Sequence, residues 1–383
     1  MIIDGHAYCF PPLGEANGFP TAQEHLRYLQ REMADHHQPV WRLRDRALGD
    51  NKMLADPQDD TLRGLKEVDF RAGGYGRFVW TVEGEEYAKQ YLPPYLTDLS
   101  HSPEMLVAQM DYVGISRAVL HAHPIMGFLN DYLADCVRCY PERLLALANI
   151  PEWKIERDPE GAVAEVERAY AKGLHGLQFS VHNRYRYGVT ESWNASACRP
   201  FWDGVTVLGK PIFFTICAPC PGSTVEDYLS QLQVWQGWLT RYPDTLAVLT
   251  HGFPWRLFLS SSPNPHQVRT SAGKGGADGL RLPDALFEPF RASNAILELL
   301  FQISLGNVWD YPYTELHPTI VQLVEKIGSE RLMWGTDMPN VERFCTYRQN
   351  LETFRVHCKG LISDEDIDNI LGGTAARLFN IGN

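Results

Sequence analysis

The feature that most constrains the fold is a regular alternation between short apolar runs and longer amphipathic stretches. Eight apolar runs have the length and composition of β-strands: MIID (1–4), RAVLHAH (117–123), LLALANI (144–150), GLHGLQFSV (173–181), PIFFTI (211–216), TLAVLTH (245–251), AILELLFQI (295–303) and RLMWGTD (331–337). Amphipathic stretches follow most of them, for example LNDYLADCVRCY (129–140), GAVAEVERAY (161–170), VEDYLSQLQVWQGWL (225–239) and LHPTIVQLVEKI (316–327). This order predicts an α/β fold with a parallel sheet.

Eight strand–helix units favour a closed barrel over an open, doubly wound sheet. No G-x-G-x-x-G motif follows the first run, which argues against a dinucleotide-binding fold. A (β/α)₈ barrel takes about 250 residues and tolerates insertions, so the 383-residue chain has room for them. We predict one domain, residues 1–383, folded as a distorted (β/α)₈ TIM barrel. It would carry an inserted lid at 18–100, with a hairpin around Glu83 and Gly84, and a polar loop at 260–279.

Charge and composition limit the partners. The net charge of −12, without a basic run, argues against nucleic acid and anionic membranes. No stretch approaches the roughly 18 apolar residues of a membrane-spanning helix, and no signal-peptide pattern opens the chain. We expect a cytoplasmic homo- or hetero-oligomer that binds a small molecule.

The eight cysteines are scattered, which is typical of reduced thiols. Two C-x-x-C pairs, Cys136 with Cys139 and Cys217 with Cys220, have spacings that occur in zinc sites. The first pair falls in a helical pattern and no further Cys or His flanks either pair, so we do not interpret them as a zinc site.

Three residues at predicted strand ends form the strongest chemical signal. His6 ends the first strand, His251 the sixth and Asp337 the eighth. The carboxyl ends of barrel strands meet at one mouth, so two imidazoles and a carboxylate would converge there as metal ligands. Taken singly, each histidine is as consistent with capping a loop.

Tyr8 lies two residues after His6 and points to the same side of a regular strand. It is either a hydrogen-bonding pocket residue or a phenolate ligand to a hard ion such as ferric iron. His182, just past the fourth strand, is a further ligand, a general base or a loop histidine.

Further residues are candidates for contacting substrate. His121 and His123 end the second strand, and at least one of them is expected to support a ligand from behind. Glu298 and Gln302 lie four apart on the predicted seventh strand, and Glu298 would need a cation partner if buried. Aromatic and cationic residues of the pocket or lid, or alternatively of the core, are Trp80, Tyr75, Arg77 and Trp255.

The chain resembles the amidohydrolase superfamily, in the branch that includes aminocarboxymuconate semialdehyde decarboxylase and related aromatic acid decarboxylases. The resemblance covers strand 1 and most of the chain from about residue 100. It is carried by IDGHAY, PEMLVAQMDYVGISRAVL, LNDYLADCVRCYPERLLALANI, GLHGLQF, VLTHGF, RLMWGTDMPN and ILGGTAARLF.

The resemblance implies a distorted barrel whose metal ligands are H-x-H on strand 1, histidines on strands 5 and 6, and Asp on strand 8. His6, His251 and Asp337 match these positions. Tyr8 replaces the second strand 1 histidine, and Thr215 occupies the strand 5 position, where it would face substrate. Exchanging imidazoles for oxygen donors favours harder ions.

The resemblance implies a divalent metal ion, zinc, manganese or iron, and a decarboxylase or hydrolase for a small carboxylated or amide-bearing substrate. His251 and Asp337 would manage protons in that reaction. Two alternatives stay open: a non-heme iron or manganese hydroxylase, including one with two ions, and a catalytically degenerate subunit that stabilises an active partner.

Overall fold

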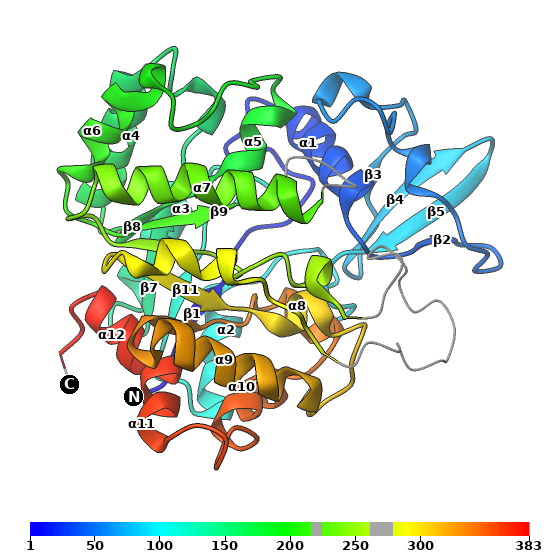
Figure 1. Cartoon of the computed structure of the whole chain (residues 1–383). Helices are drawn as coiled ribbons and strands as arrows, with labels where there is room; N and C mark the ends of the chain where they lie inside the picture. Colours follow the sequence, from blue (N-terminus) through cyan, green and yellow to red (C-terminus); the bar gives the residue numbers. More distant parts are fainter. Residues whose placement is uncertain (217–223, 261–278, 383) are drawn as a thin grey trace.

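The computed structural model describes residues 1–216, 224–260 and 279–382 (Figure 1). Eight of its strands are parallel and pair in chain order. They are β1 (Ile3–Ala7), β6 (Arg117–Leu120), β7 (Leu144–Ala148), β8 (Gly176–Ser180), β9 (Ile212–Thr215), β10 (Ala247–Leu249), β11 (Ala295–Leu299) and β12 (Leu332–Trp334). Each overlaps one of the eight predicted runs, so the strand prediction is confirmed.

The first and last of these strands, β1 and β12, meet along a seam that closes the barrel. Ala7 and Met338 form a parallel bridge, and Tyr8 N donates a hydrogen bond to Met338 O at 2.8 Å. Asp337 N donates to His6 O, also at 2.8 Å. A side chain at Gly335 would place its Cβ 2.7 Å from His6 Cβ, so only glycine permits this approach. The predicted (β/α)₈ barrel is confirmed.

Helices surround the barrel (Figure 1). The four predicted helical stretches are confirmed as α3 (Asn130–Cys139), α4 (Pro159–Ala171), α7 (Val225–Arg241) and α9 (His317–Ile327). The longest, α7, begins with a capping box between Thr224 and Asp227 and packs Trp238 edge-on against Phe214 of β9 at 4.8 Å. The other helices are α2 (Pro103–Val113), α5 (Val181–Arg186), α6 (Arg199–Thr206), α8 (Phe301–Leu305), α10 (Tyr347–Arg355), α11 (Asp364–Asp368) and α12 (Thr374–Leu378).

Side chains inside the barrel form an apolar layer below a polar one. The apolar layer contacts Ala375 and Leu378 of α12 and consists of Ile3, Val119, Leu145, Leu147, Phe213, Val248, Ile296 and Met333. Because alternate residues of a strand share a face, His121 lies above Val119 and Glu298 above Ile296. The polar layer therefore begins near the carboxyl ends of the strands, where barrel enzymes carry their sites.

The insertion at 18–100 has a structure of its own. It contains α1 (Ala22–Asp35) and an antiparallel sheet in the order β2 (Val40–Arg42), β5 (Glu85–Gln90), β4 (Arg77–Val82) and β3 (Arg71–Ala72). The predicted hairpin is confirmed, because Val82 pairs with Glu85 across Glu83 and Gly84. Figure 1 shows this sheet at one side of the barrel, next to α1.

The structure corrects one detail of the strand assignment. Strand β11 ends at Leu299, and Gln302 lies in α8, where its Nε2 donates to Thr353 Oγ1. Gln302 and Glu298 therefore do not share a strand face. The predicted polar loop at 260–279 falls almost entirely outside the described residues, as do Cys217 and Cys220.

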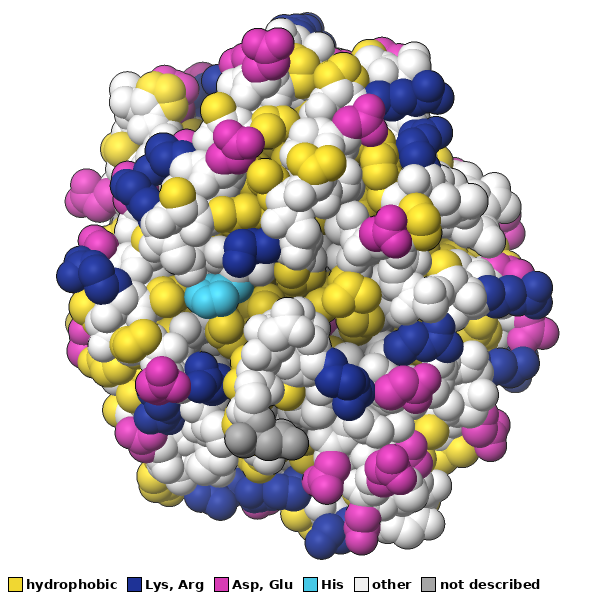
Figure 2. All heavy atoms as spheres, turned by 90° about the vertical axis from the view of Figure 1, so that its left-hand side faces the viewer, with side chains coloured by type: hydrophobic (Ala, Val, Ile, Leu, Met, Phe, Trp, Pro, Cys, Tyr) yellow, Lys and Arg dark blue, Asp and Glu magenta, His cyan; other side chains and the backbone are white. Residues whose placement is uncertain are grey.

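The surface agrees with the charge pattern of the sequence. On the face shown in Figure 2, acidic and basic side chains are interspersed. None of the helices that the structure describes is long and apolar enough to cross a membrane.

A buried carboxyl, Glu152, lies in the turn that follows β7. Its Oε1 accepts hydrogen bonds from Ser180 N at 3.1 Å and Asn183 Nδ2 at 3.0 Å, whereas Oε2 is buried without a partner among the described residues. Burial raises the pKa of Glu152 from 4.5 to about 8. The folded chain therefore holds a proton here that the unfolded chain releases at lower pH.

We expect Glu152→Gln to change how stability depends on pH. Between about pH 5 and 8 the wild-type free energy of unfolding falls as pH rises, by up to about 1.4 kcal/mol per unit from this one proton. The amide does not ionise, so the variant should lack that contribution. Urea unfolding at several pH values measures the difference in slope, with exposed Glu160→Gln as the control. Parallel slopes for wild type and Glu152→Gln would contradict this account.

Candidate metal centre

Three predicted ligands come together at the carboxyl ends of the strands. Asp337 Oδ1 lies 3.5 Å from His6 Nε2 and 4.0 Å from His251 Nε2. Ligand atoms about 2.1 Å from a shared ion lie about 3 to 4 Å from one another, so these separations fit one metal ion. The two-imidazole, one-carboxylate donor set suits zinc, manganese or iron.

Glu298 fixes the orientation of both histidines from below. His6 Nδ1 donates to Glu298 Oε2 at 2.9 Å, and the same oxygen accepts from the backbone N–H of His251 at 3.1 Å. Since His6 carries its proton on Nδ1, the lone pair of Nε2 faces Tyr8 Oη and Asp337 Oδ1. Burial also lowers the pKa of His6 well below its usual range, which keeps the ring neutral as a ligand must be.

The hydroxyl of Tyr8 lies beside this lone pair. Tyr8 Oη is 2.9 Å from His6 Nε2, a distance that suits a hydrogen bond or two neighbouring ligands of one ion. Burial, and next the nearby Asp337, raise the pKa of Tyr8 well above its usual range. In the absence of a cation the side chain is therefore a neutral phenol that donates to His6.

The backbone at two ligand positions is held in the left-handed region. His251 has φ of 64° and Asp337 has φ of 67°. Such conformations are unfavourable for residues other than glycine and cluster at functional sites.

Another buried acid, Asp4, stabilises the seam between β1 and β12. It accepts hydrogen bonds from His6 N at 3.0 Å, Thr336 Oγ1 at 2.6 Å and Tyr347 Oη at 2.7 Å.

Asp337 is the acid nearest the cavity. Burial raises the pKa of its carboxyl to about 8, while the positive charge of Arg343 and a hydrogen bond from Asn340 oppose that shift. Both imidazoles approach the same oxygen, Oδ1. Oδ2 is therefore the oxygen that neither imidazole approaches.

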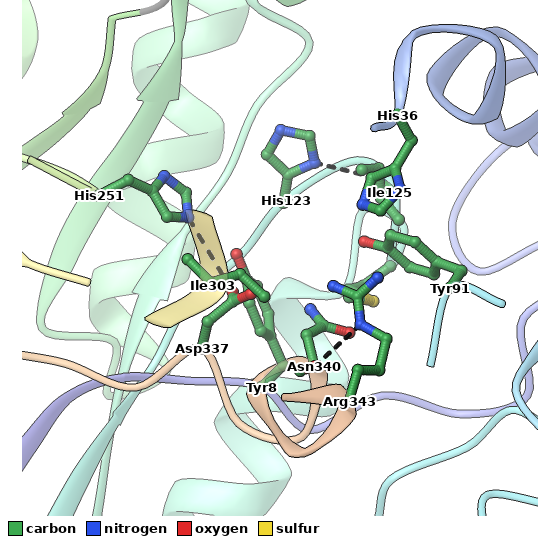
Figure 3. Close-up of a pocket in the computed structure, with 11 residues that line it drawn as sticks. Tyr8, His36, Tyr91, His123, Ile125, His251, Ile303, Asp337, Asn340 and Arg343 are labelled. Carbon is green, nitrogen blue, oxygen red and sulfur yellow. Dashed lines mark hydrogen bonds and ion pairs between the residues drawn. The ribbon is translucent and has the colours of Figure 1, made fainter. Parts of the chain in front are cut away.

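Tyr8, His251 and Asp337 line a cavity of about 120 Å³, whereas His6 lies behind its wall (Figure 3). Its lining residues are Tyr8, His36, Tyr91, His123, Ile125, Met126, His251, Ile303, Asp337, Asn340 and Arg343. Because His36 follows α1 and Tyr91 follows β5, the insertion supplies part of the wall. A cavity below the usual range of about 300 to 1,000 Å³ for drug-sized ligands suits a compact substrate.

The other histidines predicted for the site differ in their position relative to the cavity. His123 lines the cavity, but His121 stacks beneath His6 at 3.5 Å between ring centroids and donates through Nε2 to Gly5 O. His182 stacks on His123 at 5.2 Å, with Nε2 3.9 Å from Glu32 of α1. In the part of the chain that the structure describes, His182 does not join His6, His251 and Asp337 in a ligand group.

Several candidates for substrate contact lie away from the cavity wall. Glu298 lies behind His6 and acts through it. Thr215 ends β9 with a buried hydroxyl that has no hydrogen-bond partner among the described residues. Trp80 is fully buried and stacks on Phe70 in the insertion, so it belongs to the core.

Arg77 and Trp255, two further candidates, also lie outside the cavity wall. Arg77 lies over the ring of Tyr75, whose side chain is exposed. Trp255 donates through Nε1 to His251 O at 3.0 Å and packs on Phe301. Trp255 therefore supports a ligand from behind the cavity.

The sequence reasoning missed most of the wall opposite the ligands. Arg343 and Asn340 lie in a short 3-10 turn, Asn340–Arg343, that directly follows Asp337. The polar residues in PNVERF (339–344), which follow the predicted ligand Asp337 within a few residues, could have indicated that this segment contributes to the site. His36 and Tyr91 carried no local signal, because only the packing of the insertion brings them to the barrel.

We expect Glu298→Gln to weaken metal binding about 10- to 100-fold, because the partner of a ligating histidine sets its tautomer and orientation. The amide keeps the size of the side chain but can present its NH₂ group to His6 Nδ1. A chelator competition assay measures the affinity, and circular dichroism checks the fold. Exposed Glu325→Gln serves as the control, and an unchanged affinity in Glu298→Gln would contradict this role.

Fold and site together define a (β/α)₈ barrel protein in which two histidines and one carboxylate at the carboxyl ends of the strands could hold a metal ion. The chain belongs to the amidohydrolase family, since the family model described as Amidohydrolase matches residues 34–381. The predicted resemblance is confirmed. Because the match begins after His6 and Tyr8, the place of these two residues in the site rests on the geometry described above.

Solved structures with the same fold include three of particular interest. A probable 2-pyrone-4,6-dicarboxylic acid hydrolase from Acinetobacter baumannii, with citric acid bound, is 16% identical; the match covers 74% of this chain and 91% of that one, with a TM-score of 0.53. A dihydroxybenzoic acid decarboxylase from Polaromonas sp. JS666, with bound manganese, is 20% identical over 74% and 88%, with a TM-score of 0.52. The 5-carboxyvanillate decarboxylase from Sphingomonas paucimobilis is 22% identical over 74% and 84%, with a TM-score of 0.50.

Proposed function

We propose that the protein is a metal-dependent decarboxylase or hydrolase of a small carboxylated substrate, with decarboxylation as the favoured reaction. The observation that carries this proposal is the grouping of His6, His251 and Asp337 at a small cavity that His251 and Asp337 line. Similar folds that are named as aromatic acid decarboxylases, one with manganese bound, support it.

Different residues of the site would serve different steps of such a reaction. A divalent ion held by His6, His251 and Asp337 would supply Lewis acidity toward substrate oxygens. The Ile125, Met126 and Ile303 side chains form an apolar part of the cavity wall, which would reduce the access of water to a bound substrate. Decarboxylation leaves a carbon that must gain a proton, and Asp337 Oδ2 is placed to hold and deliver it.

Metal content and product analysis test the proposal. Protein purified without chelator should contain zinc, manganese or iron, and hydroxybenzoates and other small aromatic carboxylates should be screened for release of CO₂. Hydrolysis of lactones or amides, with no CO₂ release, would select the second reaction type. A chain that holds no metal and turns over neither substrate class would favour the degenerate-subunit alternative.

A second candidate, a non-heme iron or manganese hydroxylase, rests on one observation: Tyr8 Oη lies beside the metal-facing nitrogen of His6. If the phenolate binds iron, the protein should show a visible absorption band that disappears in Tyr8→Phe. If Tyr8 only donates a hydrogen bond, we expect no such band and little change in metal content. Tyr132→Phe, on the outer helix α3, is the matched control.

Two further expectations stay predictions. A homo- or hetero-oligomer is tested by light scattering after size exclusion, and the cytoplasmic location by fractionation of the cells that express the protein. The small-molecule ligands of similar structures, such as bound citric acid, support a small-molecule substrate for this chain.

A further inference from the structure

Arg343 faces the same cavity as the metal ligands. It ends the turn after β12, and its guanidinium lies over the rings of Tyr91 and Phe344, with Cζ 5.6 and 5.2 Å from their centroids. Its Nε donates to Asn340 O at 2.9 Å. Figure 3 shows Arg343 projecting between Tyr91 and Asn340, on the opposite wall from His251.

Among the residues that the structure describes, none forms an ion pair with Arg343. Its Nη1 is buried and makes no hydrogen bond to any described residue. Asp337 acts on Arg343 electrostatically but has its Oδ1 directed to the two histidines, and the nearby His36 is neutral because burial keeps its pKa well below the usual range. A buried cation with an unused donor is costly unless an anion pairs with it.

We propose that Arg343 binds a carboxylate of the substrate that does not react, so that the substrate is a small molecule with two carboxylate groups. Nη1 of Arg343 would donate to this carboxylate while the other end of the molecule reaches His251 and Asp337. The inference rests on the proposed function only for the identity of the reacting end.

The chemistry of decarboxylation explains why the retained group is the one that Arg343 binds. An ion pair with the departing carboxylate would stabilise the substrate more than the transition state, because the negative charge leaves that group as CO₂ forms. A pair with the retained carboxylate is equally strong in both states, so it fixes the position of the molecule without opposing the reaction. Tyr91, Ile125 and Ile303 in the cavity wall suit a ligand with an apolar body between its polar ends.

Binding measurements on the metal-loaded full chain test the inference. Isothermal titration should compare the dicarboxylates fumarate, isophthalate and terephthalate, which differ in carboxylate spacing, with the monocarboxylates crotonate and benzoate. We expect the tightest dicarboxylate to bind wild type better than its monocarboxylate counterpart. Arg343→Met should lose that advantage, with about 10- to 100-fold weaker dicarboxylate binding and little change for the monocarboxylate.

Controls separate recognition from folding. Arg343→Lys keeps the charge and should recover part of the affinity, and it also serves if Arg343→Met does not fold. Arg348→Met removes another arginine that lies over a tyrosine, Tyr112, and should bind like wild type. Metal content and thermal unfolding should be the same in all variants that are compared.

The outcomes distinguish this inference from the proposed function. Equal dicarboxylate binding by wild type and Arg343→Met, or no preference of wild type for any dicarboxylate, would overturn the inference even if CO₂ release is found. An arginine-dependent preference would support it even if no carboxylate is turned over, in which case the proposed reaction fails and the anion site stands.

Discussion

The Asp337→Asn variant should lose its metal ion and its activity. Asp337 supplies the only carboxylate in the ligand group with His6 and His251 among the described residues, and an amide oxygen is a neutral, weaker ligand. Changes to partners that merely orient ligands cost about 10- to 100-fold in affinity or activity, so losing a ligand should cost more than about 100-fold. Metal analysis after dialysis and turnover of the substrate found in the screen measure both effects.

Asp135→Asn is the matched control, because Asp135 lies on the exposed side of α3 and pairs with Arg138. It should keep both metal and activity. Full metal occupancy with full activity in Asp337→Asn would show that the ion does not need the Asp337 carboxylate. Loss of activity with the metal retained would assign Asp337 to proton transfer alone.

The second large effect is expected from Gly335→Ala at the seam between β1 and β12. The added Cβ would lie 2.7 Å from His6 Cβ and 3.0 Å from Leu300 Cδ1, so the strand that carries His6 has to move. Overpacking of this kind costs about 1 to 3 kcal/mol. Because His6 itself is displaced, metal affinity should fall together with the free energy of unfolding.

Gly237→Ala is the comparison. Gly237 lies within α7, where an added Cβ would meet Asn194 Nδ2 at an ordinary 3.6 Å, so the exchange should be neutral or stabilising by up to about 1 kcal/mol. Urea unfolding and chelator competition measure both variants. A Gly335→Ala protein as stable as wild type, with the same metal affinity, would mean that the seam can relax without cost.

The barrel could be predicted because each of its strands has a recognisable local sequence pattern. A buried strand such as LLALA at 144–148 is apolar throughout, and an amphipathic stretch follows it, so each unit is recognisable alone. The positions of His6, His251 and Asp337 followed from the same logic, since each ends such a run. The error at Gln302 arose because the apolar run continues past the end of β11 into α8.

The opposite wall could not be predicted, because it depends on how distant segments pack. The place of Arg343 is set by Tyr91 and Phe344, and His36 reaches the cavity through the docking of α1. The sequence left Trp80 open between the pocket or lid and the core, because large aromatics line ligand sites and a small sheet also needs an aromatic core. Sequence composition does not distinguish these two uses.

The pairing of β1 with β12 also determines when, during folding, the complete group of metal ligands can form. Two of the three ligands, His6 and Asp337, come from opposite ends of the sequence, and the third comes from β10 between them. During synthesis, the ribosome releases His6 long before the strand that precedes Asp337. Long-range contacts of this kind form slowly, so we expect the complete ligand group to form only when β1 and β12 pair and close the barrel.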